Sequence, residues 1–401
     1  MKRLIKLIKA ASRLGYKVLL FKILLPCVYL LCSAGKVDKR KTVFIEVRRD
    51  GLSNSFALLW KALSEDGRHD TELCMLRLGS CGALAYIRNC VGMAKRTAKA
   101  RYIFINEGST AFSCLPIRKA TTVIQTWHGC GAFKRVGMSA VGNGGNVTGG
   151  KTERRLFPMC RHMDFITISG ADVAWAYREA FDLHEGDGQR ICPIGVSRTD
   201  VFFDEQLVAR NTQKVRERFP GSYGKKIILY APTFRGETTK PVMPDALDID
   251  KMRRALEKDN ILLIKHHPVI KQKQPIPQGC EQFAFDVSDI DIEALLMAAD
   301  ILVSDYSSVV FEYSLLDRPM AFFVYDIDEY LDWRGLYYPF DQFCPGLSAK
   351  TTGELIDAIR SPDLYDAQKL EDFRKLHMSA CDGHSTERIL ALMDDVPDKR
   401  K

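Results

Sequence analysis

Short apolar runs alternate with helical stretches along the chain from Lys41 onward. The runs are nearly continuous in Val, Ile, Leu and Phe, which is typical of parallel strands that are buried on both faces. The pattern predicts strands at residues 42–47, 73–78, 102–106, 122–126, 165–168, 190–194, 226–230, 261–264, 301–303 and 320–324. It predicts helices at residues 54–63, 207–219 and 249–258. This alternation indicates an α/β fold with parallel sheets covered by helices.

A polar, charged stretch near residues 200–225 divides the alternation into two runs. We therefore expect two doubly wound, Rossmann-like domains facing a cleft, at residues 41–205 and 206–401. The last helix is free to pack back on the first domain, and a separate segment, residues 1–40, precedes both. Ligands of doubly wound sheets bind beyond the carboxyl ends of the strands. The residues that follow predicted strands are therefore the first candidates for a site.

The net charge of +8 belongs to the first forty residues, which hold ten of the 58 Lys and Arg and one of the 50 acidic residues. The rest of the chain carries 48 basic and 49 acidic residues, a net of −1, so a nucleic-acid-binding body is not supported. In residues 1–40 apolar side chains recur at roughly helical spacing with lysines between them. The most apolar run, residues 18–32, is shorter than the roughly 20 residues that span a bilayer.

An amphipathic helix lying on an anionic membrane surface is the favoured interpretation of this basic segment. A signal peptide, a spanning anchor and a helix that only docks on the body remain alternatives. The twelve cysteines form no C-x-x-C pair and no metal-like grouping with histidine. We read them as reduced core residues, which points to the cytoplasmic side and to no structural zinc.

The turn Asp305-Tyr306-Ser307-Ser308 follows a predicted buried strand and opens a helix. Two hydroxyls and several free backbone N–H groups then lie at a helix N-terminus, where the dipole favours an anion. Glu312 lies about one helical turn further on and faces the same crevice. The alternative is that the serines merely cap the helix.

Four more polar clusters follow predicted strands, at residues 125–131, 194–200, 231–235 and 265–268. Together they place two histidines, two arginines and a lysine at strand ends, which suits a pyrophosphate. The glycine-rich stretch at residues 142–150 lacks the Lys-Ser/Thr ending of a phosphate loop. It is expected to be a surface loop, with a lid over an acceptor as the alternative.

Seven motifs in this order resemble the CDP-glycerol glycerophosphotransferase family, the teichoic-acid primases and polymerases of bacterial cell walls. They are Asp50-Gly-Leu-Ser-Asn-Ser55, Gln125-Thr-Trp-His-Gly129, Tyr230-Ala-Pro-Thr-Phe-Arg235, Lys265-His-His-Pro268, Asp305-Tyr-Ser-Ser308, Arg334-Gly-Leu-Tyr337 and Asp382-Gly-His-Ser-Thr-Glu-Arg388. The resemblance runs from about Val43 to the end of the chain. It implies a GT-B architecture, with CDP-glycerol held mainly by the second domain and the acceptor entering from the first.

The resemblance places His128 at the acceptor hydroxyl and His267 near the phosphates, as the catalytic pair. The residues expected to bind the donor are Gly129, Cys130, Gly131, Ala132, Arg198, Pro232, Thr233, Lys265, His266, Ser307, Ser308 and Glu312, with Arg235 added from the strand-end pattern. The chain departs from the family at three places. Cys130-Gly131 stands where Thr-Pro is common, Ser197 stands before Arg198 where Pro is common, and Glu312 replaces an Asp.

The reaction implied is attack of an acceptor hydroxyl on the phosphorus that bears glycerol, with CMP leaving. His128 is expected to remove the hydroxyl proton. Ser307, Ser308, Lys265 and His267 are expected to offset the charge on the leaving phosphate, with a protonated His267 acting as a charge stabiliser or as a general acid. Asp326-Ile-Asp328 resembles a metal-binding DxD motif, but it follows a strand in the order that the family shows anyway. No set of metal ligands is assigned, and the sequence leaves open whether the enzyme uses Mg²⁺.

We therefore expect a peripheral enzyme at the cytoplasmic face of the cell membrane that uses CDP-glycerol and a lipid-linked, undecaprenyl-type glycan or polyol-phosphate acceptor. Three alternatives remain: a CDP-ribitol transferase, a GT-B sugar transferase or epimerase, and a non-catalytic membrane scaffold. The sequence leaves open whether one unit or many are added.

Overall fold

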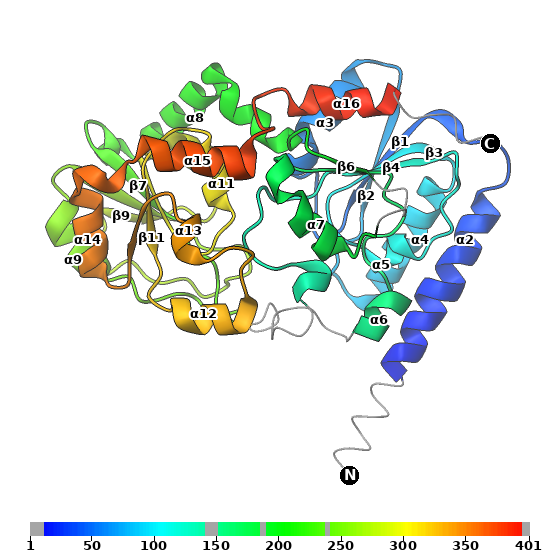
Figure 1. Cartoon of the computed structure of the whole chain (residues 1–401), viewed down its shortest axis with the longest axis horizontal. Coiled ribbons are helices and arrows are strands. Elements are labelled where there is room, and N and C mark those ends of the chain that lie inside the picture. Colours follow the sequence, from blue (N-terminus) through cyan, green and yellow to red (C-terminus); the bar gives the residue numbers. More distant parts are fainter. Residues whose placement is uncertain (1–11, 141–150, 185–189, 237–240, 395–401) are drawn as a thin grey trace, which may run out of the picture.

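The computed structural model describes residues 12–140, 151–184, 190–236 and 241–394, and it has two six-stranded parallel sheets side by side (Figure 1). The glycine-rich stretch at residues 142–150 and the first eleven residues of the basic segment lie outside the described residues. The predicted α/β fold with two doubly wound sheets is confirmed.

The first sheet has the order β2-β1-β3-β4-β5-β6, with every neighbouring pair parallel. Its strands are β1 (Asp38–Glu46), β2 (Asp70–Met75), β3 (Ala100–Ile105), β4 (Thr122–Gln125), β5 (Phe165–Thr167) and β6 (Arg190–Cys192). All four residues of β4 are buried, as expected of an inner strand covered on both faces. The strand order reverses between β1 and β3, so the loops that follow these strands diverge there.

The second sheet has the order β12-β11-β10-β7-β8-β9 and is also parallel throughout. Its strands are β7 (Lys226–Tyr230), β8 (Asn260–Ile264), β9 (Ala284–Asp286), β10 (Ile301–Ser304), β11 (Met320–Phe323) and β12 (Leu347–Ala349). The reversal falls between β7 and β10. The two predicted polar clusters at residues 231–235 and 305–308 therefore meet at this switch point.

Helices cover both sheets, and the last two divide between them. The α-helices are α2 (Leu25–Cys32), α3 (Asn54–Glu65), α4 (Ala83–Thr97), α5 (Thr110–Ser113), α6 (Lys151–Leu156), α7 (Ala174–Phe181), α8 (Glu205–Arg218), α9 (Ile249–Leu256), α10 (Ile292–Ala298), α11 (Val309–Ser314), α12 (Ile327–Arg334), α13 (Phe340–Phe343), α14 (Thr352–Arg360), α15 (Ala367–Met378) and α16 (Ser385–Asp394). Helix α15 packs on the second half, where Phe373 stacks on Phe311. The red helix α16 lies over the first half (Figure 1), where Ile389 and Met393 join the core around Phe44.

Strand boundaries differ from the prediction where the pattern is short. Strand β2 starts at Asp70, three residues before the predicted 73–78, and its outer position leaves only one of its six residues fully buried. Strands β9 and β12 were not predicted. Each has three residues with only one large apolar side chain among them, so no apolar run marks it.

A helix at Ser12–Cys32 begins the described part of the chain, and its middle, η1 (Val18–Leu24), has π-helical turns. Leu20, Phe21, Leu25 and Tyr29 are buried in the same core as residues of α4. This helix is the single one among the described residues that is long and apolar enough to cross a membrane.

Candidate active site

The loop after β4 presents His128. Trp127 has a left-handed backbone (φ 55°), and its N–H donates to Oε1 of Gln125 at 2.9 Å, which turns the chain sharply out of the sheet. His128 Nδ1 lies 3.2 Å from the carbonyl oxygen of Asn106. A carbonyl only accepts hydrogen bonds, so Nδ1 carries the proton and Nε2 keeps a lone pair.

Solvent reaches His128, but protein atoms crowd around the ring. This desolvation lowers the pKa of His128, although Glu107 opposes the shift. The imidazole is therefore neutral near pH 7. A neutral imidazole with a free Nε2 is the form required of a general base.

The rest of this loop lies flush against α11. Gly131 has φ 60°, and a Cβ there would lie 2.2 Å from the ring of Phe311. Its N–H donates to Oγ of Ser169 at 2.8 Å, and that hydroxyl donates to the carbonyl oxygen of His377 at 2.6 Å. These contacts join the His128 loop to the second half of the molecule.

Gly129 is partly exposed within this loop, but the side chains of Cys130 and Ala132, which were also expected to bind the donor, are buried in the core. In this chain Cys130 therefore replaces the common Thr with a packed residue. The structure does not place its thiol where a solvent-borne ligand reaches it.

The turn after β10 holds two differently placed serines. Ser308 is exposed and stands before the first turn of α11, yet its side chain makes no capping hydrogen bond. Ser307 Oγ is 3.5 Å from the N–H of Val309, at the limit of a hydrogen bond. The capping alternative therefore does not account for Ser308, whose hydroxyl stays available to a ligand.

Arg235 is engaged by the protein itself. Its guanidinium pairs with Asp305 at 2.8 Å and with Asp326 through two nitrogens, and it lies 5.2 Å from the ring centre of Tyr306. Asp305 also accepts hydrogen bonds from N–H and Oγ1 of Thr233, at 2.9 and 3.1 Å. Arg235 thus joins the ends of β7, β10 and β11, and its contacts are those of a positioning residue.

Asp326, the first carboxylate of the DxD-like motif, is used in this same network. Thr233 and Pro232 are both buried beneath the turn. Within the described residues no group of three or more His, Cys, Asp or Glu side chains is placed to hold a metal ion.

The loop after β8 carries Lys265, His266 and His267. Lys265 Nζ donates to the carbonyl oxygens of Ser288, at 2.9 Å, and of Ile290, so it fixes the neighbouring loop. His266 is buried, and neither ring nitrogen has a hydrogen-bond partner among the described residues.

His267 packs on the ring of Phe234 at 4.9 Å between ring centres, and its Nδ1 accepts from the N–H of Val269 at 3.3 Å. Burial, with a smaller effect of the nearby cations Lys134 and Arg49, lowers the pKa of His267 to about 4. His267 is therefore neutral near pH 7 in this structure. Its Nε2–H remains a hydrogen-bond donor.

Arg198 links the two halves directly. It lies in the 3₁₀ segment η4 (Ser197–Phe203), and Nη1 donates to the carbonyl oxygen of His128 at 3.1 Å. Nη2 lies 3.2 Å from Oε1 of Glu293, and Nε lies 3.8 Å from Oε1 of Glu312. Burial raises the pKa of Glu293 to about 7, and it raises the pKa of Glu312, against the opposing pull of Arg198.

Glu293 was not predicted as a site residue. It stands in the first turn of α10, outside any motif, and only its position opposite Arg198 marks it. The one signal in the sequence is that Glu293 is the single charged residue in the otherwise apolar stretch Ile292–Ala298.

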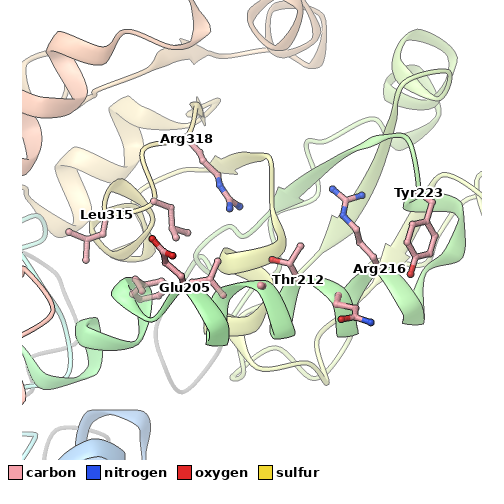
Figure 2. A pocket seen from close by; sticks show the side chains of 11 residues that line it. Glu205, Thr212, Arg216, Tyr223, Leu315 and Arg318 are labelled. Atoms are coloured by element: carbon pink, nitrogen blue, oxygen red, sulfur yellow. The ribbon is translucent and has the colours of Figure 1, made fainter.

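A cavity of about 660 Å³ lies away from these residues, between α8 and the end of α11 (Figure 2). The arginines beside it are already paired. Arg216 contacts Asp300 at 3.0 Å, and Arg318 donates to the carbonyl oxygens of Met297 and Ala299. None of the described residues that line this cavity offers a free cation to a phosphate, so the strand-end loops remain the candidate site.

Two Rossmann-like halves, with a neutral His128 on one and the exposed hydroxyl of Ser308 on the other, define a GT-B-like protein. The sequence profile of the CDP-glycerol:poly(glycerophosphate) glycerophosphotransferase family matches residues 27–394. The chain belongs to this family.

Several characterised relatives are similar over most of the chain. The teichoic acid ribitol-phosphate polymerase TarL of Staphylococcus aureus is 34% identical over 296 residues, 73% of this chain and 51% of TarL. The chain thus spans about half the length of that relative. The teichoic acid ribitol-phosphate primase of Bacillus spizizenii is 32% identical over 368 residues, 90% of this chain and 92% of the primase.

A solved structure of the wall teichoic acid polymerase TagF superimposes with a TM-score of 0.73 at 23% identity, over 97% of both chains. This similarity confirms the GT-B-like fold.

Proposed function

We propose that the chain transfers glycerol phosphate from CDP-glycerol to a hydroxyl of a lipid-linked acceptor at the membrane, with release of CMP, in the synthesis of teichoic acid or a related surface polymer. The observation that carries the proposal is the neutral His128, with Nε2 free, tied through Arg198 to the helix that follows the Ser307-Ser308 turn. Family membership supports the same reaction.

In the proposed step the acceptor oxygen forms a bond to the phosphorus that carries glycerol. The bond from that phosphorus to the oxygen bridging it to CMP breaks, and CMP leaves with the electron pair. His128 Nε2 takes the hydroxyl proton as the new bond forms, which contributes roughly 10²–10⁴-fold to the rate.

Negative charge develops on the leaving phosphate, and it requires hydrogen-bond donors on the side of the phosphorus away from His128. Ser308 offers its hydroxyl, and His267 offers Nε2–H. A bound pyrophosphate raises the pKa of His267 from its low value, because a nearby anion favours the imidazolium. His267 then moves toward the protonated form that offsets charge best.

Ribitol phosphate is the second candidate for the transferred group. The ribitol-phosphate primase of Bacillus spizizenii aligns over 90% of this chain, whereas a glycerol-phosphate primase of Bacillus subtilis is 30% identical over 71%. This difference in coverage favours a test of both CDP-alcohols.

The test compares CDP-glycerol, CDP-ribitol and a UDP-sugar as ligands that raise the melting temperature. The expected result is stabilisation by a CDP-alcohol, and CMP release when a lipid-linked acceptor is added. In His128→Ala, donor binding should persist while CMP release falls at least about 100-fold. Stabilisation by the UDP-sugar alone would overturn the proposal.

We also propose that the protein lies peripherally on an anionic membrane at the cytoplasmic face, through the outer side of the Ser12–Cys32 helix. Leu19, Ile23, Leu30 and Leu31 are 60%, 51%, 58% and 79% exposed there, while the inner side is part of the core. A spanning or cleaved helix would leave the buried positions of that core uncovered. A helix that lies in the membrane–water interface keeps its inner side packed in the core and buries its outer apolar side in lipid.

Flotation with vesicles that contain anionic lipid tests this placement. The double variant Leu30→Glu and Leu31→Glu should lose vesicle binding, because charge on the apolar side opposes burial in lipid. Val242→Glu, at a similarly exposed apolar residue in the second half, is the matched control and should bind normally. Equal binding by all three proteins would contradict the proposal.

A further inference from the structure

The loop between β1 and α3, the β1–α3 loop, holds one arginine whose charge is not matched within the loop. Arg48 pairs with Glu107 at 2.8 Å, and Asp50 pairs with Arg77 at 2.6 Å. Arg49 stands between them in the sequence and is exposed. Its guanidinium makes no ion pair or hydrogen bond with the described part of the chain. The neighbouring charges are therefore paired, and the guanidinium of Arg49 is left for a ligand.

The same loop is fixed in place and reaches the second half of the molecule. The N–H of Ser53 donates to Oε1 of the fully buried Glu46 at 2.7 Å, which anchors the end of the loop to the end of β1. Nδ2 of the next residue, Asn54, donates to Oδ2 of Asp291, in the second half, at 3.3 Å. Arg49 is thus carried by a loop that the surrounding contacts hold against the other half.

Positive charge from the first half reaches His267 of the second half. Burial is the main cause that lowers the pKa of His267, and the cations Lys134 and Arg49 lower it as well. Lys134 Nζ lies 5.6 Å from the ring centre of Tyr330. Two cations beside a neutral imidazole create a positive potential, and an anion placed there is attracted by both.

Cations of the second half that follow strands are already engaged. Arg235 pairs with Asp305 and Asp326, and Lys265 donates to backbone carbonyl oxygens. A pyrophosphate or a phosphodiester requires positive charge that the protein has not itself neutralised. Arg49 provides such a charge, and it does so from the first half.

We propose that Arg49 is a phosphate-binding residue of the active site, which the β1–α3 loop supplies from the first half to phosphate held beside His267. The inference rests on the proposed function, since it takes a CDP-alcohol and a lipid-linked acceptor as substrates. A guanidinium donates two parallel hydrogen bonds to phosphate oxygens. Both the pyrophosphate of the donor and the phosphate of the acceptor have the chemistry that Arg49 recognises.

The variant Arg49→Gln tests the inference, because it keeps a polar side chain and removes the charge. A hydrogen bond to a charged group accounts for about tenfold in affinity. If Arg49 contacts the donor, CDP-glycerol or CDP-ribitol and inorganic pyrophosphate should each bind about tenfold more weakly in calorimetry. Arg210→Gln, at an exposed arginine of α8, is the matched control and should bind all of them as the wild type does.

Steady-state kinetics identify the acceptor as the alternative source of the phosphate. If Arg49 contacts the acceptor, donor binding is unchanged, and the KM for the lipid-linked acceptor rises about tenfold at constant kcat. In either pattern the difference between wild type and variant should shrink at high salt, because salt screens an exposed charge. Either pattern supports the inference.

Donor binding and an acceptor KM that both match the wild type in Arg49→Gln would overturn the inference. An equal loss in Arg210→Gln would overturn it as well, because the effect would then belong to net charge and not to this loop. Both outcomes leave the proposed function intact, because the wild type still binds the donor and releases CMP. Failure of the wild type to bind any CDP compound would instead refute the proposed function, and the inference with it.

Discussion

His377 lies in an apolar cage, and this predicts a loss of stability in mild acid. The residue is 1% exposed, and the rings of Phe373, Phe311, Phe343 and Tyr338 surround it at 4.8–5.3 Å between ring centres. Its Nδ1 has no hydrogen-bond partner in the described residues. Burial alone lowers the pKa of His377 from 6.5 to about 4.

The sign follows from the two states. Below pH 6.5 the unfolded chain binds a proton at His377, whereas the folded protein does not until the pH approaches 4. Stability is therefore complete above pH 6.5 and is lost as the pH falls from 6.5 toward 4. Each tenfold difference in proton affinity corresponds to about 1.4 kcal/mol, so this histidine removes about 2 kcal/mol at pH 5 and about 3 kcal/mol at pH 4.

The perturbation is His377→Phe, which keeps an aromatic ring in the cage and removes the titrating group. Urea unfolding of both proteins at pH 8 and pH 5 gives the free energy of unfolding at each pH. The wild type should lose about 2 kcal/mol more than the variant between the two. A packing cost of the larger ring appears at both pH values and cancels, as does titration of His267.

His384→Gln is the matched control, because His384 is an exposed histidine in the same part of the chain. It should lose as much stability as the wild type between pH 8 and pH 5. If His377→Phe also lost as much as the wild type, the argument that burial without a partner keeps His377 neutral would be wrong.

Three further variants test how the site is built. Ser308→Ala should leave the melting temperature unchanged, because the side chain makes no capping hydrogen bond. The same variant should weaken donor binding about tenfold, whereas a lower melting temperature would show that Ser308 caps the helix. Gly131→Ala should destabilise the fold by more than about 1 kcal/mol, since φ is positive and the new Cβ would meet Phe311, and calorimetric melting measures it. Asp305→Asn should lower the free energy of unfolding, measured with urea, by about 3–5 kcal/mol, because the buried charge of Arg235 loses one of its two carboxylate partners. A loss under about 1 kcal/mol would show that Asp326 alone compensates this charge.

Much of the fold was predictable from apolar periodicity. Inner strands such as β7 and β8 are nearly continuous apolar runs because they are covered on both faces, and their positions match the prediction to within a residue. Strands β9 and β12 were missed, since each has only one large apolar side chain and no apolar run marks it. Their places come from pairing with β8 and β11.

Candidate residues were also found by their position after strands. His128 and Ser308 both proved accessible at strand ends, as that rule anticipates. Arg235 and Lys265 satisfy the same rule, yet their donors are taken by Asp305, by Asp326 and by backbone carbonyls. Position after a strand indicates which residues reach the site, and leaves undetermined which of them a ligand can use.

The sequence by itself therefore determined the α/β class, the division into two doubly wound sheets and the set of polar turns that face each other, because these depend on local periodicity. Only the tertiary structure decided the charge state of the site. Glu293 and Arg198 are 95 positions apart in the chain, and they meet because α10 and η4 both pack against α8. Electrostatic interactions depend on distance and burial, and both are set by packing between segments that no local pattern relates.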